Sequence, residues 1–309
     1  MLVYALKRVV AGAVAIVMLT AVVHGLMAVT PGDPLVALLG PAVRDLPSEH
    51  QSRLRAEAGL DRPWPQQYAA YMQAAIRGDL GLSRRSGRPV SAELRDRLPA
   101  TIALTGAALP LALALGLTTG VMAATFARSW FDTLLSATIV LGSAVPVYLT
   151  GLLLLLLFSL ALGWLPPSGG GSWRHLILPA LTLAVASAAP LARITRSSLL
   201  DALAEPHVVA ARARGLSPGQ VLVRHGLRNA LIPVLTVAGI DLGRMLGGAV
   251  FVEAVFSWPG VGRSMVDAIT ARDLPLVQGI VLVGALTVLL ISLLVDLAYL
   301  RLDPRVRYR

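Results

Sequence analysis

The chain has 309 residues, of which 56% are hydrophobic and 14% are charged, and its mean hydropathy is +0.72. A soluble domain carries about 25% charged residues, so this composition excludes an ordinary soluble globular protein and a disordered chain. The net charge of +10 includes one lysine, Lys7, which lies in no Gly-rich turn, and the chain has no cysteine. These counts exclude a P-loop, disulfides and thiolate metal sites in this chain. The five histidines form no HxxxH pair, so we expect no metal site.

Six apolar stretches are long enough to cross about 30 Å of hydrocarbon as helices, which takes about 20 residues each. They are residues 9–29, 101–125, 134–161, 176–193, 230–252 and 276–299. The sequence therefore predicts an all-α polytopic membrane protein with six transmembrane helices. The first stretch could instead be a signal peptide, but it is longer than a usual h-region and lacks a clean cleavage site, which favours a retained anchor. The third stretch could cross twice, with Pro146 at a turn.

The distribution of charge favours six spans with both termini in the cytoplasm. The segments that this topology places inside carry 13 basic and 4 acidic residues, which satisfies the positive-inside rule. A double crossing of the third stretch would place the Arg-rich residues 194–229 outside, so we reject it.

This topology predicts three parts. Residues 1–29 form an N-terminal transmembrane helix, residues 30–100 an extracytoplasmic loop, and residues 101–309 a core of five transmembrane helices with a cytoplasmic loop at 194–229.

The predicted extracytoplasmic loop carries two helix patterns and a basic cluster. We expect helices from Ser48 to Ala58 and from Pro65 to Ile76, because each begins at a helix-start residue and ends just before a glycine. Arg84, Arg85 and Arg88 belong either to a solvated loop or to a docking surface for an external partner.

Two charged residues interrupt the fifth span. Asp241 and Arg244 are three residues apart and therefore share a helical face. Charges at membrane depth face an interior or a water-filled path. The two residues form either a neutralising structural pair or part of a translocation pathway.

The most patterned segment is VAARARGLSPGQVLVRHGL, within residues 194–229. It predicts a short helix that presents Arg212 and Arg214 and that ends at Gly215. Ser217 then caps a second helix that begins at Pro218.

This segment resembles the cytoplasmic loop of ABC importer permeases, whose motif is E-A-A-x3-G-x9-I-x-L-P. Ala210, Ala211, Gly215 and Leu227 match the motif, whereas Val209, His225 and Arg228 replace its Glu, Ile and Pro. The peptide-type branch shows an ARAKG…RHALRNAL form, which this chain follows with Arg214 in place of Lys.

The resemblance extends along the chain. Further similar stretches are PGDP (31–34), GLDRPWPQQY (59–68), GDLGLS (78–83), RLPAT (97–101), GSAVPVYLTG (142–151), GGAVFVEAVFSWPGVGR (247–263) and LDPRVRY (302–308). The chain thus resembles a permease subunit of an ABC importer of the dipeptide/oligopeptide/nickel type.

The resemblance implies a type I permease fold in a bacterial or archaeal cytoplasmic membrane, in contact with lipid and not with nucleic acid. The chain would form half of a pathway for di- or oligopeptides, beside a second homologous permease subunit. An extracytoplasmic binding protein would deliver the substrate. Two cytoplasmic ATPase subunits would bind ATP and Mg, so this chain would be neither an enzyme nor a cofactor carrier.

The resemblance also assigns residues. The loop 205–228 would form a coupling helix in a groove of the ATPase. The candidate coupling residues are Ala210, Ala211, Arg212, Arg214, Gly215, Arg224, His225 and Leu227. The candidate pathway residues are Asp241 and Arg244. Trp258, Pro259 and Gly260 would lie near an outer gate, or would form an interfacial aromatic anchor and a turn.

The sequence alone leaves three alternatives open. The same machinery could import nickel, haem or another ligand. The chain could be an ATP-independent secondary transporter or channel, since six spans with an intramembrane charge pair allow it. The third alternative is an intramembrane hydrolase, which needs a nucleophile and a base at the same depth. Ser143 and Ser159 lie in a span, whereas His24 and His175 lie near predicted outer ends, so their positions disfavour this alternative.

Overall fold

The regular structure of this chain is helical. The computed structural model describes residues 2–29, 33, 35–36, 40–57 and 59–302, and these contain no strand beyond an isolated antiparallel bridge between Leu82 and Pro89. The predicted all-α class is therefore confirmed for the described residues. Two of the motifs lie partly outside the described residues: PGDP at residues 31–32 and 34, and LDPRVRY at residues 303–308.

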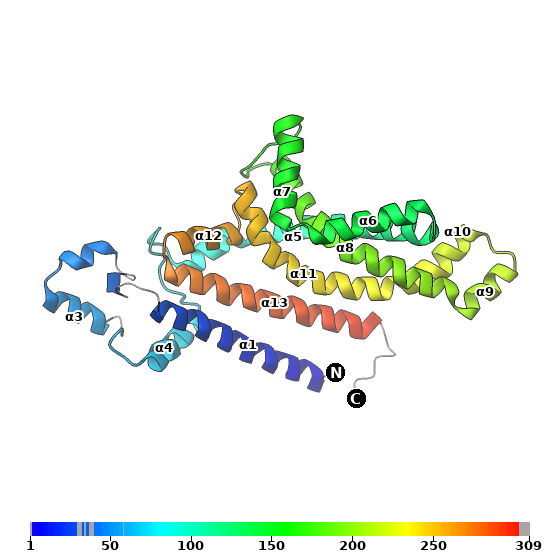
Figure 1. The fold of residues 1–309 in the computed structure, drawn as a ribbon. Helices are drawn as coiled ribbons and strands as arrows, with labels where there is room; N and C mark the ends of the chain where they lie inside the picture. The colour runs from blue at the N-terminus through cyan, green and yellow to red at the C-terminus, as the bar shows by residue number, and fades with distance from the viewer. Residues whose placement is uncertain (1, 30–32, 34, 37–39, 58, 303–309) are drawn as a thin grey trace. The chain divides into compact units, whose positions relative to one another are not determined.

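The long helices of the described residues can be followed in Figure 1. They are α1 (Leu2–Val29), α5 (Val90–Thr125), α8 (Trp173–Ala204), α11 (Arg228–Phe256) and α13 (Leu274–Leu302). The shorter elements are η1 (Pro41–Asp45), α3 (Ser48–Glu57), α4 (Trp64–Ile76), α6 (Trp130–Ala144), α7 (Val147–Leu155), η2 (Leu156–Ala161), α9 (Pro206–Ala213), α10 (Pro218–Val221), η3 (Leu222–Leu227) and α12 (Val261–Thr270). Of these, η1 is a 3₁₀ helix, and η2 and η3 are π-helical turns.

The described residues contain five helices that are long and apolar enough to cross a membrane, and six spans if α6 and α7–η2 count as one. Each predicted span falls on one of these segments. Helix ends differ, because the predicted spans cover the most apolar stretches and the helices continue beyond them. α8 continues past residue 193 to Ala204, since Thr195, Leu199 and Ala202 keep an apolar face buried while charged residues occupy the other face.

The predicted span 134–161 is not one straight helix. The helix formed by α7 and η2 is bent by 106° from the direction of α6. Pro146 has no N–H to donate to a continuing helix, and it restricts Val145, which is extended at φ −79° and ψ 126°. The proline thus divides the apolar stretch into two helices.

The described chain divides into two compact units. The first contains the residues up to Pro99 together with Gly260–Leu290, and the second contains Ala100–Pro259 together with the residues from Ile291. This division follows packing, whereas the predicted three parts follow membrane topology and remain a prediction.

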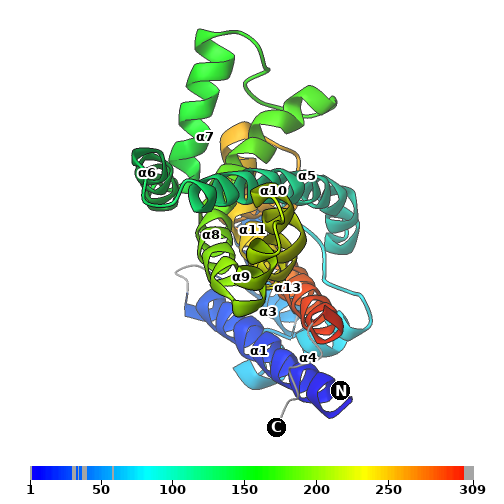
Figure 2. The ribbon, with the colours of Figure 1, turned by 90° about the vertical axis from the view of Figure 1, so that its right-hand side faces the viewer.

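The second unit is organised around α8, which pairs with α11, α6 and α7 (Figure 2). Its core includes Leu104 of α5, Leu183 and Leu191 of α8, and Met245 and Phe256 of α11, all at most 2% exposed. α8 and α11 therefore bury much of their surface against each other and against α5.

Glycines bring α5 close to α8. A Cβ at Gly116 would lie 2.6 Å from the Cβ of Leu191, and one at Gly120 would lie 2.6 Å from both Ala192 O and the Cβ of Thr195. Small residues allow transmembrane helices to approach in this way, and the van der Waals attraction between the close backbones helps hold the helices together.

In the first unit, α1 packs against α4 through rings. His24 lies with its ring centroid 5.7–5.9 Å from those of Trp64, Tyr68 and Tyr71, and its Nδ1 is 2.7 Å from Nε2 of Gln278. Burial, and to a lesser extent the neighbouring Tyr68, raises the pKa of Tyr71 to about 12. This phenol therefore stays neutral.

The two helices predicted in the 30–100 region are present as α3 and α4. The residues that follow them, Gly59 and Gly78, have φ +68° and +83°. This left-handed conformation favours glycine and ends each helix.

Asp273 organises the other part of the first unit. Its carboxylate is fully buried, accepts hydrogen bonds from Ser83 Oγ at 2.6 Å and Arg85 N at 3.1 Å, and also accepts from Leu276 N at 3.3 Å. It thus caps the first turn of α13 and fixes the 83–85 loop on it.

A single methyl group tests the α5–α8 contact. Gly120→Ala should destabilise the purified chain by about 1–3 kcal/mol, because the new Cβ meets backbone that cannot move aside. The midpoint of thermal unfolding in detergent measures this loss.

The matched control is Gly106→Ala on the same helix, where a Cβ would meet nothing within 4 Å. This change should leave the midpoint unchanged or raise it, since alanine favours helix. Equal midpoints for the two variants would show that the close approach is not a constraint.

Candidate functional site

The residues predicted for coupling lie together at one end of the second unit. We call residues 205–228 the α9–α10 segment; it consists of α9, a short turn, α10 and η3 (Figure 1). α9 turns Val208 and Ala211 inward, both 0% exposed, and it leaves Ala210, Arg212 and Arg214 exposed. The predicted short helix with projecting arginines is therefore present.

The turn after α9 is built as its sequence indicates. Gly215 has φ +86°, a left-handed conformation that glycine adopts without a steric penalty. Ser217 then begins a capping box, in which its Oγ accepts from Gln220 N at 3.4 Å and Gln220 Oε1 accepts from Ser217 N at 3.1 Å. These two features fix the direction of the chain between α9 and α10.

The second helix of the segment is not separate from the fifth span. α10, η3 and α11 follow one another without a break, as a helix of 39 residues from Pro218 to Phe256. The π-helical turn η3 holds Arg224, His225 and Leu227, and the ring of His225 lies 6.2 Å from that of His207 on α9. Any displacement of this segment therefore reaches α11 directly.

The α9–α10 segment also packs tightly on α8. A Cβ at Gly226 would lie 2.9 Å from Leu199 Cδ1 and 3.0 Å from Leu203 Cδ2. Ala124, Leu199 and Ala230 form a small buried cluster at the same end, so α5, α8 and α11 meet there.

Asp241 and Arg244 approach each other on α11, as their spacing predicts. Arg244 NH1 lies 3.6 Å from Asp241 Oδ1. The two side chains differ sharply in exposure, at 4% for Asp241 and 69% for Arg244. Asp241 Oδ2 is buried without a hydrogen-bond partner among the described residues. The carboxylate thus retains a capacity to accept a donor.

The Trp258 region lies at the opposite end of the second unit. Trp258 is 8% exposed, and its indole N–H donates to Ala100 O at 2.9 Å. The ring is packed inside the unit, unlike an interfacial anchor. Ser257 has φ +52° and ends α11, Pro259 lies beside Gly170, and Gly260 is the N-cap of α12.

Sequence reasoning missed the residue that supports this end. Glu253 is fully buried and accepts from Thr101 Oγ1 at 2.6 Å. The predicted topology instead assigns it to the external connection that follows the fifth span. The sequence offered one indication of its burial. Glu253 lies three residues before Phe256, so a helix places both side chains on the same face.

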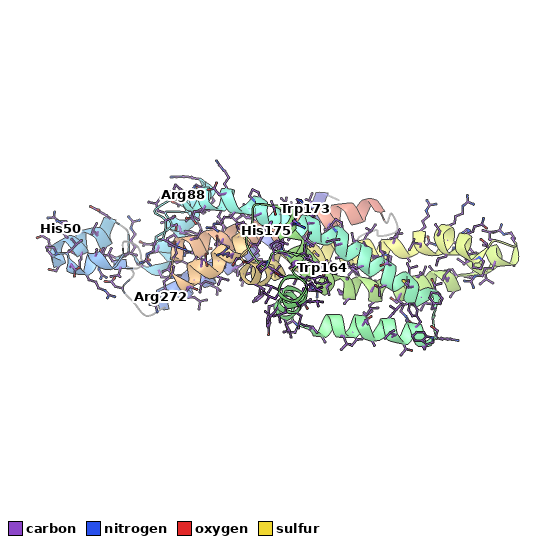
Figure 3. All side chains as sticks on the ribbon, turned by 90° about the horizontal axis from the view of Figure 1, so that it is seen from above. His50, Arg88, Trp164, Trp173, His175 and Arg272 are labelled. Atoms are coloured by element: carbon purple, nitrogen blue, oxygen red, sulfur yellow. The ribbon has the colours of Figure 1, made fainter. Side chains whose placement is uncertain are left out.

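The loop between α7 and α8 borders the same end. Gly169 N donates to Phe256 O at 2.9 Å, and the ring of Trp164 lies 5.9 Å from that of Phe158. Figure 3 shows Trp164, Trp173 and His175 around this loop. His175 Nδ1 lies 2.9 Å from Oγ of Ser172, the N-cap residue of α8, so this histidine forms a hydrogen bond at the start of that helix.

The basic cluster of the first unit is largely bound within that unit. Arg84 donates to Arg272 O at 2.8 Å and to Val36 O at 2.6 Å, and Arg85 pairs with Asp267 at 3.3 Å. The role of this cluster in docking an external partner stays a prediction.

Known proteins resemble this chain along its whole length. Residues 116–308 match the family described as the binding-protein-dependent transport system inner membrane component, and residues 1–105 match the description of its N-terminal part. The chain belongs to this family. It is therefore a permease subunit of an ABC importer and not an enzyme, and ATP hydrolysis belongs to partner ATPases.

Curated relatives of the permease include the glutathione transport system permease protein GsiC of Escherichia coli K12 and of Shigella dysenteriae serotype 1. Each is 40% identical over 309 residues, which cover 100% of both chains.

Solved structures share the fold of the permease. An inward-facing MetNI methionine ABC transporter matches with a TM-score of 0.58 and 21% identity, covering 68% of this chain and 96% of that chain. A crystal structure of an amino acid ABC transporter with histidines gives a TM-score of 0.54 and 20% identity, covering 68% and 94%.

The charge pair of the permease can be tested by a double-mutant cycle. Arg244→Gln leaves the buried carboxylate of Asp241 without its cation. It should lower the free energy of unfolding by about 1–2 kcal/mol, which lies between the values for exposed and buried ion pairs. Adding Asp241→Asn should recover part of that loss, because the uncompensated charge is removed. Thermal unfolding of the four proteins in detergent gives the coupling, and strictly additive losses would contradict a pair.

Proposed function

We propose that this permease imports small peptides and that its α9–α10 segment seats in a groove of a cytoplasmic ATPase subunit. The observation that carries the coupling proposal is the construction of the segment. It presents Arg212 and Arg214 outward from a helix whose other face is anchored by Val208 and Ala211. An anchored helix whose exposed face carries arginine can transmit a push from a partner.

The orientation follows from this assignment. The α9–α10 end faces the cytoplasm, together with both termini, in agreement with the positive-inside distribution of charge. The Trp258 end then faces outward, where Trp258, Pro259 and Gly260 border the outer gate. An extracytoplasmic binding protein delivers the substrate there, and a second homologous permease subunit completes the pathway.

Asp241 and Arg244 are the proposed pathway residues. Support comes from the buried Oδ2 of Asp241, which finds no hydrogen-bond donor among the described residues. Buried polar atoms are nearly always paired, so this atom favours a donor from outside the chain. A peptide amine or the second permease subunit supplies such a donor.

Small peptides are the favoured substrates because the relatives that are 40% identical over the whole chain are named as glutathione permeases. Nickel is the second candidate of the family. No group of three or more His, Asp or Glu side chains among the described residues could hold a metal ion, but selectivity in such systems lies largely with the binding protein.

Gly215 gives the sharpest test of the coupling segment. Gly215→Val places a β-branched residue at φ +86°, where even a simple side chain costs roughly 1–2 kcal/mol. The turn should therefore rearrange, and the ATPase subunits should no longer copurify with the permease in detergent.

The matched control is Gly219→Val in the same segment, where a Cβ would meet nothing within 4 Å and φ is not positive. This variant should retain the ATPase. If Gly215→Val also retains it and still transports, the coupling assignment is wrong.

The substrate class is tested by uptake into proteoliposomes that contain the complete transporter and its binding protein. Labelled glutathione or a dipeptide should enter in an ATP-dependent manner, and unlabelled peptide should compete for uptake. ATP-dependent uptake of nickel or haem without peptide competition would overturn the peptide assignment and leave the coupling assignment intact.

A further inference from the structure

An ion pair that the sequence analysis did not single out joins α6 to α8. Arg196 Nε lies 2.8 Å from Asp132 Oδ1, and Arg196 NH2 lies 2.7 Å from Asp132 Oδ2. This two-point geometry fixes both the distance and the angle between the side chains. The Asp132 side chain is 8% exposed and that of Arg196 is 32% exposed, so the carboxylate is buried and the guanidinium is partly exposed.

The carboxylate of Asp132 is also tied to the turn that precedes α6. Its Oδ2 accepts from Arg128 N at 3.0 Å, and its Oδ1 lies 3.3 Å from Ser136 Oγ. Arg128 has φ +66°, which is unfavourable for a residue with a side chain and persists where neighbours hold it. Ser129 caps α6 by accepting from Asp132 N at 3.2 Å. The whole α5–α6 turn is therefore built around this aspartate.

The other partner lies on the helix that leads into the α9–α10 segment. Arg196 stands on α8 just before Leu199 and Leu203, which are the two residues that Gly226 of η3 approaches most closely. Displacement of the segment therefore reaches α8 next to Arg196.

α6 and α8 also pack against each other through an apolar interface. Ile139 of α6 packs against Ala189 and Ala192 of α8. Alanine methyl groups form a smooth apolar surface without directional bonds, and such a contact permits sliding along the helix. The ion pair adds a directional, two-point bond to this interface.

We propose that the Asp132–Arg196 pair makes α6 move as one body with the adjoining half of α8 when the ATPase displaces the α9–α10 segment. Both are positioning residues, because they act through helices and touch neither ATP nor substrate. α6 leads through the bend at Pro146 to α7, where Gly151 packs against Phe256 near the Trp258 end. The pair therefore directs the motion toward the outer gate.

This inference rests on the proposed coupling function and adds the route by which α6 responds. A merely structural pair would lower stability when broken but would not change how the helices move with nucleotide. The test therefore measures a nucleotide-dependent distance.

Spin labels can report that distance cleanly, because the chain has no cysteine of its own. Leu134→Cys on α6 and Ser197→Cys on α8 place labels at two exposed positions near the pair. Dipolar EPR on the complete transporter compares the nucleotide-free state with the state trapped by ATP and vanadate.

With Asp132 and Arg196 intact, the separation between the labels should stay the same in both states. In Asp132→Asn it should change by about 2 Å on trapping, the size of helix shifts in such transitions. Arg196→Lys, which keeps the charge but loses the two-point geometry, should show the same change and serves if Asp132→Asn fails to assemble.

Asp132→Glu, which keeps the carboxylate, should restore an unchanged separation. The matched control is Asp201→Asn, the same chemical change at an exposed position of α8. It should behave like the intact pair.

Two results would overturn the inference: a separation that changes on trapping with the pair intact, or one that stays fixed in both Asp132→Asn and Arg196→Lys. Failure of the ATPase subunits to copurify with the otherwise unaltered labelled chain would instead overturn the coupling function on which the inference rests.

Discussion

The close approach of α5 and α8 is the constraint on which the second unit depends. Gly116 and Gly120 allow the two backbones to come so near that an added methyl group would collide with Ala192 O or with Leu191. α8 is held in this way at residues 188–195, and it also packs on α6, α7 and α11 and buries residues on several faces. Lipid tails are as apolar as leucine, so such packing replaces the hydrophobic drive that assembles soluble proteins.

A helix fixed in this manner joins the two ends of the unit. At one end, Leu199 and Leu203 contact η3, and at the other the start of α8 lies beside the loop that bonds to Phe256 O. Polar contacts mark both ends, with Asp132 and Arg196 at the first and Glu253 and Thr101 at the second. Buried charged groups are costly at membrane depth and occur where they have partners. The pattern agrees with a helix that transmits motion between a coupling segment and a gate.

Much of this fold could be predicted from the sequence, because apolar length and charge distribution are strong signals in membrane proteins. The turn at Gly215 and the cap at Ser217 were also readable, since each depends on local chemistry. The pair of Asp132 and Arg196 was not, because its members are far apart in the chain and each looks like an ordinary residue at a membrane boundary. The sequence indicates a possible turn at Pro146, but its angle depends on packing that the sequence does not reveal.

The central claim is that the α9–α10 segment transmits motion from an ATPase subunit to α8. Ala210 is exposed on α9, and the chain has no cysteine, so Ala210→Cys places a photoreactive maleimide at a single position of this chain, which is labelled before the transporter is assembled. The measurement is the identity of the protein that becomes cross-linked to this site in membranes containing the whole transporter. The account predicts an ATPase subunit, with a yield that changes between the nucleotide-free and vanadate-trapped states. Cross-linking only to lipid, to the second permease subunit or to the binding protein would contradict it.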